Sequence, residues 1–150
     1  MPQSLVLNYI HIVFSTKNRH PFIDENIRDE LFTYLAGICN YLDCCPIIVG
    51  GYKDHVHILC TLSRKIPLMR LIEELKTSSS KWIKTKGIQY RRFYWQNGYG
   101  TFSVGYKHVD IVKKYISNQE EHHSKNFFKD EYRSLLTEYD MEHDERYMWD

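Results

Sequence analysis

Two histidines separated by one apolar residue, His55-Val56-His57, form the first pattern in this sequence that could do chemistry. Side chains alternate between the faces of a strand, so both imidazoles would point to the same face of a sheet. Further along the chain, Tyr115 and Gln119 stand four positions apart in a helical pattern, which puts a phenol and an amide oxygen about one turn apart on one helix face. Imidazoles and an amide oxygen can bind a metal ion, and a phenol can act as a nucleophile. The set suits metal-assisted attack on a phosphodiester.

Twelve tyrosines compete for the nucleophile's role, and Tyr115 differs from most of them in its surroundings. It lies on a polar helical stripe that includes Gln119, and Lys113 and Lys114 are beside it. A helix side that simply faces solvent would show the same periodicity. The spacing alone therefore leaves both interpretations open.

The elements that must position these side chains follow from periodicity and turn residues. Strand-like runs cover 5–16, 46–52 and 55–62, with Lys53-Asp54 joining the last two as a hairpin, and a further strand is expected within 89–106. Apolar residues at helical spacing predict helices from Asp24 to about 43, from Pro67 to near 87, from 109 to about 127, and from 130 to 139.

This order, β-α-β-β-α-β followed by C-terminal helices, predicts an α+β fold: a ferredoxin-like sandwich with an antiparallel sheet and two helices packed on one face. In that topology the strand over 55–62 lies at the centre of the sheet. Its histidines would sit on the face that the two crossover helices leave open. The length predicts one domain over 1–150, with a body over about 1–128 and an acidic helical tail over about 129–150.

Charge is unevenly distributed although the formal net charge is only +1. Residues 130–150 contain eight acidic residues against Arg133 and Arg146, so the rest of the chain is basic. A basic body suits an anionic partner, with nucleic acid as the first candidate. The acidic tail could compete for the same surface, but a solvated helix with no role in binding is the simpler interpretation.

Cysteine usage and hydropathy restrict the remaining possibilities. The four cysteines contain no C-x-x-C pair, which favours free thiols over a disulfide framework or a zinc site. The longest apolar stretches are too short to cross a bilayer, and the chain begins without the features of a secretory signal. We therefore expect a cytoplasmic protein with no membrane partner.

Several of these segments together resemble a known family, the HUH-class single-tyrosine transposases of bacterial insertion sequences (the insertion-sequence 200-like family). The resemblance extends from about Leu5 to Phe128. It includes the histidine-hydrophobic-histidine motif and the later tyrosine-x-x-x-glutamine helix. Other matching stretches are His11-Ile12-Val13-Phe14-Ser15-Thr16-Lys17-Asn18-Arg19, Ser79-Ser80-Lys81-Trp82, Trp95-Gln96-Asn97-Gly98-Tyr99-Gly100-Thr101-Phe102-Ser103 and Lys114-Tyr115-Ile116-Ser117-Asn118-Gln119-Glu120-Glu121-His122-His123.

The resemblance implies specific roles for the residues that match. His55, His57 and Gln119 would bind a divalent ion, Mg²⁺ or Mn²⁺, and Tyr115 would be the nucleophile. The implied reaction is cleavage of single-stranded DNA that leaves a 5′-phosphotyrosine link and a free 3′ hydroxyl, followed by strand transfer. The implied partners are single-stranded DNA with hairpin ends and a second copy of the chain in a homodimer.

Binding of the DNA is expected from basic and aromatic residues outside that site. The predicted backbone contacts are Lys17, Arg19, Lys81, Lys84, Lys86, Arg91 and Arg92, and the candidates for stacking on unpaired bases are Phe93, Tyr94 and Trp95. Two alternatives remain open. One is a domesticated relative that uses the same chemistry to process chromosomal repeats. The other is a non-catalytic module that binds single-stranded nucleic acid, because RNA recognition motifs share this element order.

Overall fold

The structure, a computed structural model, describes residues 2–123 and 126–150. Within these residues, the strands are β1 (Tyr9–Ser15), β2 (Pro46–Gly51), β3 (His55–Thr61) and β4 (Gly100–Val104). They form one antiparallel sheet in the order β2-β3-β1-β4. β1 and β3 are therefore central strands with neighbours on both sides.

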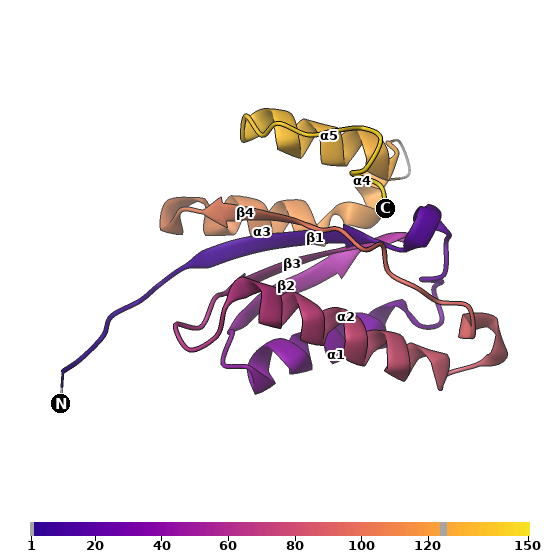
Figure 1. Cartoon of the computed structure of the whole chain (residues 1–150), viewed down its shortest axis with the longest axis horizontal. Coiled ribbons are helices and arrows are strands. Elements are labelled where there is room, and N and C mark those ends of the chain that lie inside the picture. The colour runs from indigo at the N-terminus through magenta and orange to yellow at the C-terminus, as the bar shows by residue number, and fades with distance from the viewer. Residues whose placement is uncertain (1, 124–125) are drawn as a thin grey trace.

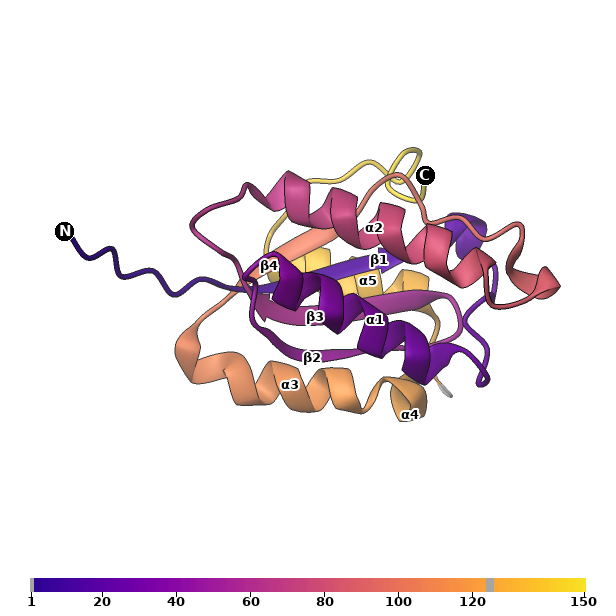
Figure 2. The same ribbon diagram turned by 90° about the horizontal axis from the view of Figure 1, so that it is seen from below.

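Helices cover both faces of this sheet (Figure 1). They are α1 (Arg28–Tyr41), α2 (Leu68–Lys84), α3 (Val109–Ser117), α4 (Gln119–His123) and α5 (Phe128–Glu138), with short 3-10 turns at Lys17–Arg19, Ile88–Tyr90 and Tyr106–His108. α1 and α2 lie side by side on one face, while α3 runs along β2 and α5 lies on the opposite face (Figures 1 and 2). The predicted ferredoxin-like α+β fold with added C-terminal helices is confirmed.

Alternation along the central strands separates the two faces of the sheet. The even-numbered residues of β1 and β3 pack against α1 and α2 in the larger core, which contains Ile12, Phe14, Val56, Ile58 and Cys60 among others. The odd-numbered residues point to the opposite face and include both histidines of the H-x-H motif. This division follows directly from the period of two in a strand.

The second face is covered by two smaller apolar clusters. In one, α5 buries Phe128, Tyr132, Leu135 and Leu136 against β1 and β4. In the other, Ile116 of α3 packs with residues of β3 and β4. The prediction that the C-terminal helix is simply solvated is therefore wrong for α5, because one side of it is buried against the sheet.

The three largest differences between the predicted elements and the structure are the following. The first strand begins at Tyr9 rather than Leu5, because Tyr9 pairs with the last residue of β3 and the last residue of β4, so residues before it have no partner strand. The helix predicted from Asp24 begins at Arg28; Asp24 instead caps the preceding turn by accepting from the Ile27 amide. The helix predicted over 109–127 is interrupted at Asn118, and part of its predicted end, 124–125, lies outside the described residues.

The cysteines and helices agree with two further expectations. All four cysteines are free, and Cys39, Cys44 and Cys60 are buried. In the described part of the chain, none of the helices has the length and apolar character needed to span a bilayer.

Candidate metal centre

His55 and His57 lie at the centre of the sheet, on the face opposite α1 and α2. β3 places them beside β1, where His55 pairs with Ser15 and His57 pairs with Val13. Both histidine side chains are fully buried. Because strands on both sides fix the backbone of β3, the two imidazoles are held in a rigid frame.

Each of these imidazoles is oriented by a second side chain. Asp54 Oδ1 lies 2.7 Å from His55 Nδ1, and His11 Nε2 lies 2.7 Å from His57 Nδ1. These contacts leave the Nε2 atoms of His55 and His57 directed into the site, as in proteins where a histidine binds metal through one nitrogen and is oriented through the other. Burial, together with nearby His57, lowers the pKa of His11 to about 3, and Glu131 partly opposes the shift. His11 is therefore neutral at physiological pH.

α3 and the start of α4 bring the tyrosine and the glutamine to the same site. Gly50 of β2 is paired with His57, and a Cβ at Gly50 would lie 2.7 Å from the backbone oxygen of Ile116. The absence of a side chain thus allows α3 to pack closely on β2. This places Tyr115 near His57, with ring centroids 5.7 Å apart, and allows Gln119 Oε1 to contact His55 Nε2 at 2.9 Å.

A carboxylate that the sequence did not single out occupies the middle of the site. Glu131 of α5 is only 5% exposed. Its Oε1 atom is 2.9 Å from His57 Nε2 and 3.4 Å from His55 Nε2. Its Oε2 atom accepts hydrogen bonds from Gln119 Nε2, at 2.9 Å, and from the Tyr115 hydroxyl.

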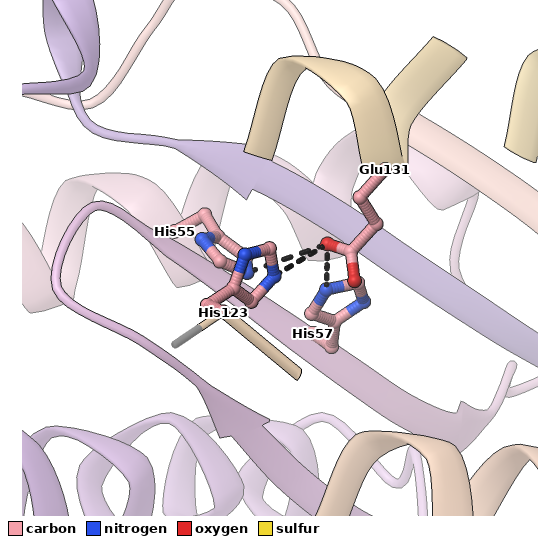
Figure 3. Close-up of side chains that lie close together, drawn as sticks. All are labelled: His55, His57, His123 and Glu131. Carbon is pink, nitrogen blue, oxygen red and sulfur yellow. Dashed lines mark hydrogen bonds and ion pairs between the residues drawn. The ribbon is translucent and has the colours of Figure 1, made fainter. Parts of the chain in front are cut away.

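His123 completes a group of side chains that could hold a metal ion (Figure 3). One ligand atom from each of His55, His57, His123 and Glu131 lies within 4.8 Å of the others. His123 Nε2 is buried and lacks a hydrogen bond, although it lies 3.1 Å from Glu131 Oε1. Imidazoles together with a carboxylate are a ligand set typical of divalent transition metals, so the residues present fit such an ion.

The charges in this cluster follow from burial and from the close contacts. Burial lowers the pKa of His57, which favours the neutral imidazole. Burial alone would raise the pKa of Glu131, but the close interactions with His57 and His123 outweigh it and hold that pKa below its usual range. Burial, with the nearby Glu131 carboxylate, raises the pKa of Tyr115. Glu131 is thus an ionised acceptor, and Tyr115 is a neutral donor.

The structure therefore brings together the four site residues that the sequence singled out, namely His55, His57, Tyr115 and Gln119. Sequence reasoning missed His11, His123 and Glu131. Glu131 does carry a recognisable signal, because it falls within the apolar side of its own helix, beside Phe128, Tyr132 and Leu135. A charged residue on a buried helix face is rare unless it is paired.

The predicted DNA-binding residues fall on more than one surface. Lys17, Arg91 and Arg92 line one cavity of about 660 Å³ together with Tyr94. Lys84 lies over the Tyr94 ring, 4.4 Å from its centroid. The others are dispersed: Lys81 is exposed on α2, Lys86 lies over the Trp82 ring, and Arg19 lines a groove with Asp54 and α5 residues.

The prediction for base stacking is only partly compatible with the structure. Tyr94 is 58% exposed and available. Phe93 and Trp95 are buried in the larger core, where each ring packs edge-on against a neighbour, so they cannot stack on DNA without unfolding. The alternation of this segment, which hides the two flanking rings and exposes the middle one, was not recognised from the sequence.

Fold and site together define a class of protein: an α+β sandwich whose sheet carries a candidate metal centre beside a tyrosine. The chain belongs to the family described as Transposase IS200 like, whose model matches residues 4–119. That match covers most of the chain and ends at Gln119, so His123, Glu131 and all of α5 lie beyond it.

Two solved structures share this architecture. One is a Deinococcus radiodurans protein provisionally named a transposase, 20% identical, with a TM-score of 0.62 over 79% of this chain and 98% of that chain. The other is a REP-associated tyrosine transposase bound to a REP hairpin, 13% identical, with a TM-score of 0.61 over 82% of this chain and 73% of that chain. At these identities the likeness establishes the fold. Among curated proteins, no sequence matches this chain.

Proposed function

We propose that this protein is a DNA transposase that cleaves and rejoins single-stranded DNA, with Tyr115 as the nucleophile. The convergence of the phenol with the expected metal ligands carries the proposal. Tyr115 and Gln119 donate to the same carboxylate that lies against His57 Nε2. A nucleophile and a ligand set that face one point meet the geometric requirement for attack on a phosphate held there.

The reaction consists of one exchange of ester bonds. The Tyr115 oxygen forms a bond to phosphorus and the bond from phosphorus to the 3′ oxygen breaks. The phenol loses its proton, and the departing 3′ oxygen takes one up to become a hydroxyl. The 5′ phosphate remains on Tyr115 as an ester, so a 3′ hydroxyl can reverse the step and rejoin DNA without ATP.

A divalent ion such as Mg²⁺ or Mn²⁺, held by His55, His57 and Gln119, would polarise a non-bridging oxygen of the scissile phosphate. The remaining tasks belong to the chain itself. Asp54 and His11 orient the two imidazoles, and α3 holds Tyr115 at the site. Because Tyr115 reaches the histidines of its own chain, the geometry supports assembly of the site in cis. A homodimer, which the family resemblance implies, is not needed to complete it.

The cavity lined by Lys17, Arg91 and Arg92 is the best-supported surface for the DNA backbone. It is connected to the site through the backbone: the Lys17 amide donates to the Tyr94 carbonyl, and the Thr16 amide donates to the carbonyl of Asp54, the residue before His55. A strand bound in this cavity would lie near the end of the sheet that carries His55. The hairpin-bound neighbour supports a hairpin-bearing strand as the substrate.

The test is formation of a covalent protein–DNA adduct. Wild type, Tyr115→Phe and Tyr41→Phe would be incubated with hairpin-bearing single-stranded oligonucleotides and Mg²⁺ or Mn²⁺, and analysed on denaturing gels. We expect an adduct with wild type and with Tyr41→Phe, because Tyr41 is 86% exposed on α1, away from the site, and no adduct with Tyr115→Phe.

The substrates should include hairpins from insertion-sequence ends and from chromosomal repeats. Cleavage restricted to the second kind would favour the domesticated, repeat-processing alternative. Binding of these oligonucleotides by wild type without an adduct under any of the conditions would reject the transposase and favour the non-catalytic binding module.

A further inference from the structure

Glu131 is unusual both in its burial and in its place in the sequence. It lies on the buried side of α5, whose neighbouring residues Phe128, Tyr132 and Leu135 form an apolar contact with the sheet. An ionised carboxylate on such a face is unfavourable unless charged or polar partners compensate for its lost hydration. It also lies beyond residues 4–119, the part of the chain that the family model matches. The general family pattern therefore gives no reason for its presence.

The partners of this carboxylate are the groups expected to bind a metal and to attack DNA. Glu131 Oε1 is within 3.4 Å of the Nε2 atoms of His55, His57 and His123. Three imidazole nitrogens and one carboxylate oxygen that converge in this way match the donors that proteins offer to Mn²⁺ and similar ions. His123 Nε2 supports this interpretation, because it is buried and has no hydrogen bond.

The other carboxylate oxygen lies where a substrate must come. Glu131 Oε2 accepts from the Tyr115 hydroxyl, so the carboxylate is the group that directly faces the nucleophile. An attacked phosphorus must approach that hydroxyl to within about 3–3.5 Å. A phosphate and the Glu131 carboxylate are both anionic and cannot occupy this position together.

We infer that Glu131 is a metal ligand which α5 supplies to the DNA-free protein, and that the substrate phosphate must displace it from the site. The inference has a ligand half, that Glu131 binds the metal ion, and a displacement half, that the substrate phosphate displaces Glu131. Only the displacement half rests on the proposed function. The helix is thus an internal competitor of DNA for the metal centre. Its carboxylate occupies the site until a phosphodiester takes its place.

The ligand half is tested by calorimetric titration of the full-length, DNA-free protein with MnCl₂. We expect one Mn²⁺ to bind to wild type and at least tenfold weaker binding to Glu131→Gln. The matched control is Glu138→Gln, which removes an exposed carboxylate from the same helix and should leave the affinity unchanged. Equal Mn²⁺ affinities for wild type and a folded Glu131→Gln would overturn the assignment.

The displacement half is tested by adduct formation at Mn²⁺ concentrations that saturate each variant. Glu131→Gln should then form the Tyr115 adduct at least as fast as wild type, because its neutral side chain competes less well with the phosphate. A tenfold or larger loss of rate at saturating Mn²⁺ would show that Glu131 assists the reaction and would reject the competition. If wild type forms no adduct, the proposed function fails, while the Mn²⁺ titration still decides whether Glu131 is a ligand.

A measurement that keeps Glu131 in place avoids dependence on the folding of a Glu131 variant. Paramagnetic Mn²⁺ should broaden the NMR signals of Phe128 and Tyr132 in the wild-type protein if α5 lies against the bound ion. Adding a hairpin oligonucleotide to Mn²⁺-loaded Tyr115→Phe, which cannot form the adduct, should reduce this broadening. Signals that stay sharp in the first experiment, or stay equally broad in the second, would contradict the inference.

Discussion

His11 and His57 form a buried pair whose protons can be arranged in two ways. With no metal bound, His57 Nε2 can donate to Glu131, so its Nδ1 accepts from His11 Nε2. A His57 that binds metal through Nε2 must instead carry its proton on Nδ1 and donate it to His11. A neutral His11 can act as donor or acceptor at Nε2. It therefore satisfies His57 in both states.

This arrangement predicts that His11→Phe weakens Mn²⁺ binding by about 10–100-fold, the usual effect of removing an orienting partner from a ligand histidine. His11→Gln keeps a polar group near His57 Nδ1 and should restore part of the affinity. Calorimetric titration measures both, and the ¹⁵N shifts of His57 report which nitrogen carries the proton. A folded His11→Phe protein with wild-type affinity and an unchanged His57 tautomer would contradict the prediction.

The sequence predicts the site residues only where a local rule applies. The period of two in a strand was sufficient to place His55 and His57 on one face, and helical spacing was sufficient to relate Tyr115 to Gln119. Glu131 and His123 reach the site through the packing of α5 and α4, which depends on contacts between distant parts of the chain. Glu131 was grouped with the acidic tail because of its charge, and its place on the apolar side of its helix does not show which part of the chain that side packs against.

At the scale of elements, the contact between α3 and β2 determines where the nucleophile stands. The position of Tyr115 follows from that of the next residue, Ile116. The backbone oxygen and the side chain of Ile116 lie directly above Gly50. The interruption after Ser117 does not separate Tyr115 from Gln119, because the Asn118 amide still donates to the carbonyl of Lys114. The helix is thus only locally distorted between the nucleophile and the glutamine.

We predict that Gly50→Ala lowers the free energy of unfolding by about 1–3 kcal/mol, since an added Cβ overpacks the contact with α3. It should also reduce adduct formation, because α3 must shift away and take Tyr115 with it. Gly37→Ala is the matched control: it lies in α1 with no atom within 4 Å of the added Cβ and should stabilise the protein by about 0.5–1 kcal/mol. Urea unfolding measures both. If the two variants prove equally stable, α3 is not held in close contact with β2 in the way described.

Element boundaries show why prediction of the fold was good but incomplete. Helix and strand types followed from periodicity, and the order of the elements implied the sheet topology. The start of β1 could not be read in the same way, because Leu5 and Leu7 continue the apolar pattern yet have no partner strand and are exposed. An apolar residue in a strand-like run is covered only where a partner strand lies beside it. The length of the partner strand cannot be read from the run itself.

At the scale of the whole molecule, the basic body and the acidic C-terminal segment meet at the candidate metal centre. α5 binds to the sheet through apolar contacts with Val13 and Phe102. It also contributes one carboxylate to a group of imidazoles from β3 and α4. The acidic tail therefore interacts with the rest of the chain through burial at one point, in addition to any long-range effect of its net charge.

Because the cluster joins β3, α4 and α5, an ion bound there should stabilise the native state as a cross-link between distant segments. Ligand binding to the folded state alone contributes about 2.7 kcal/mol at one hundred times Kd. For a chain of this length that corresponds to a rise in Tm of about 5–10 °C. We therefore predict that saturating MnCl₂ raises the Tm of the DNA-free wild type by this amount and that EDTA reverses it. The increase should be much smaller in Glu131→Gln at the same Mn²⁺ concentration and unchanged in Glu138→Gln. Thermal unfolding followed by circular dichroism gives the result, and a Tm insensitive to Mn²⁺ in the wild type would show that the cluster does not hold the ion in the folded protein.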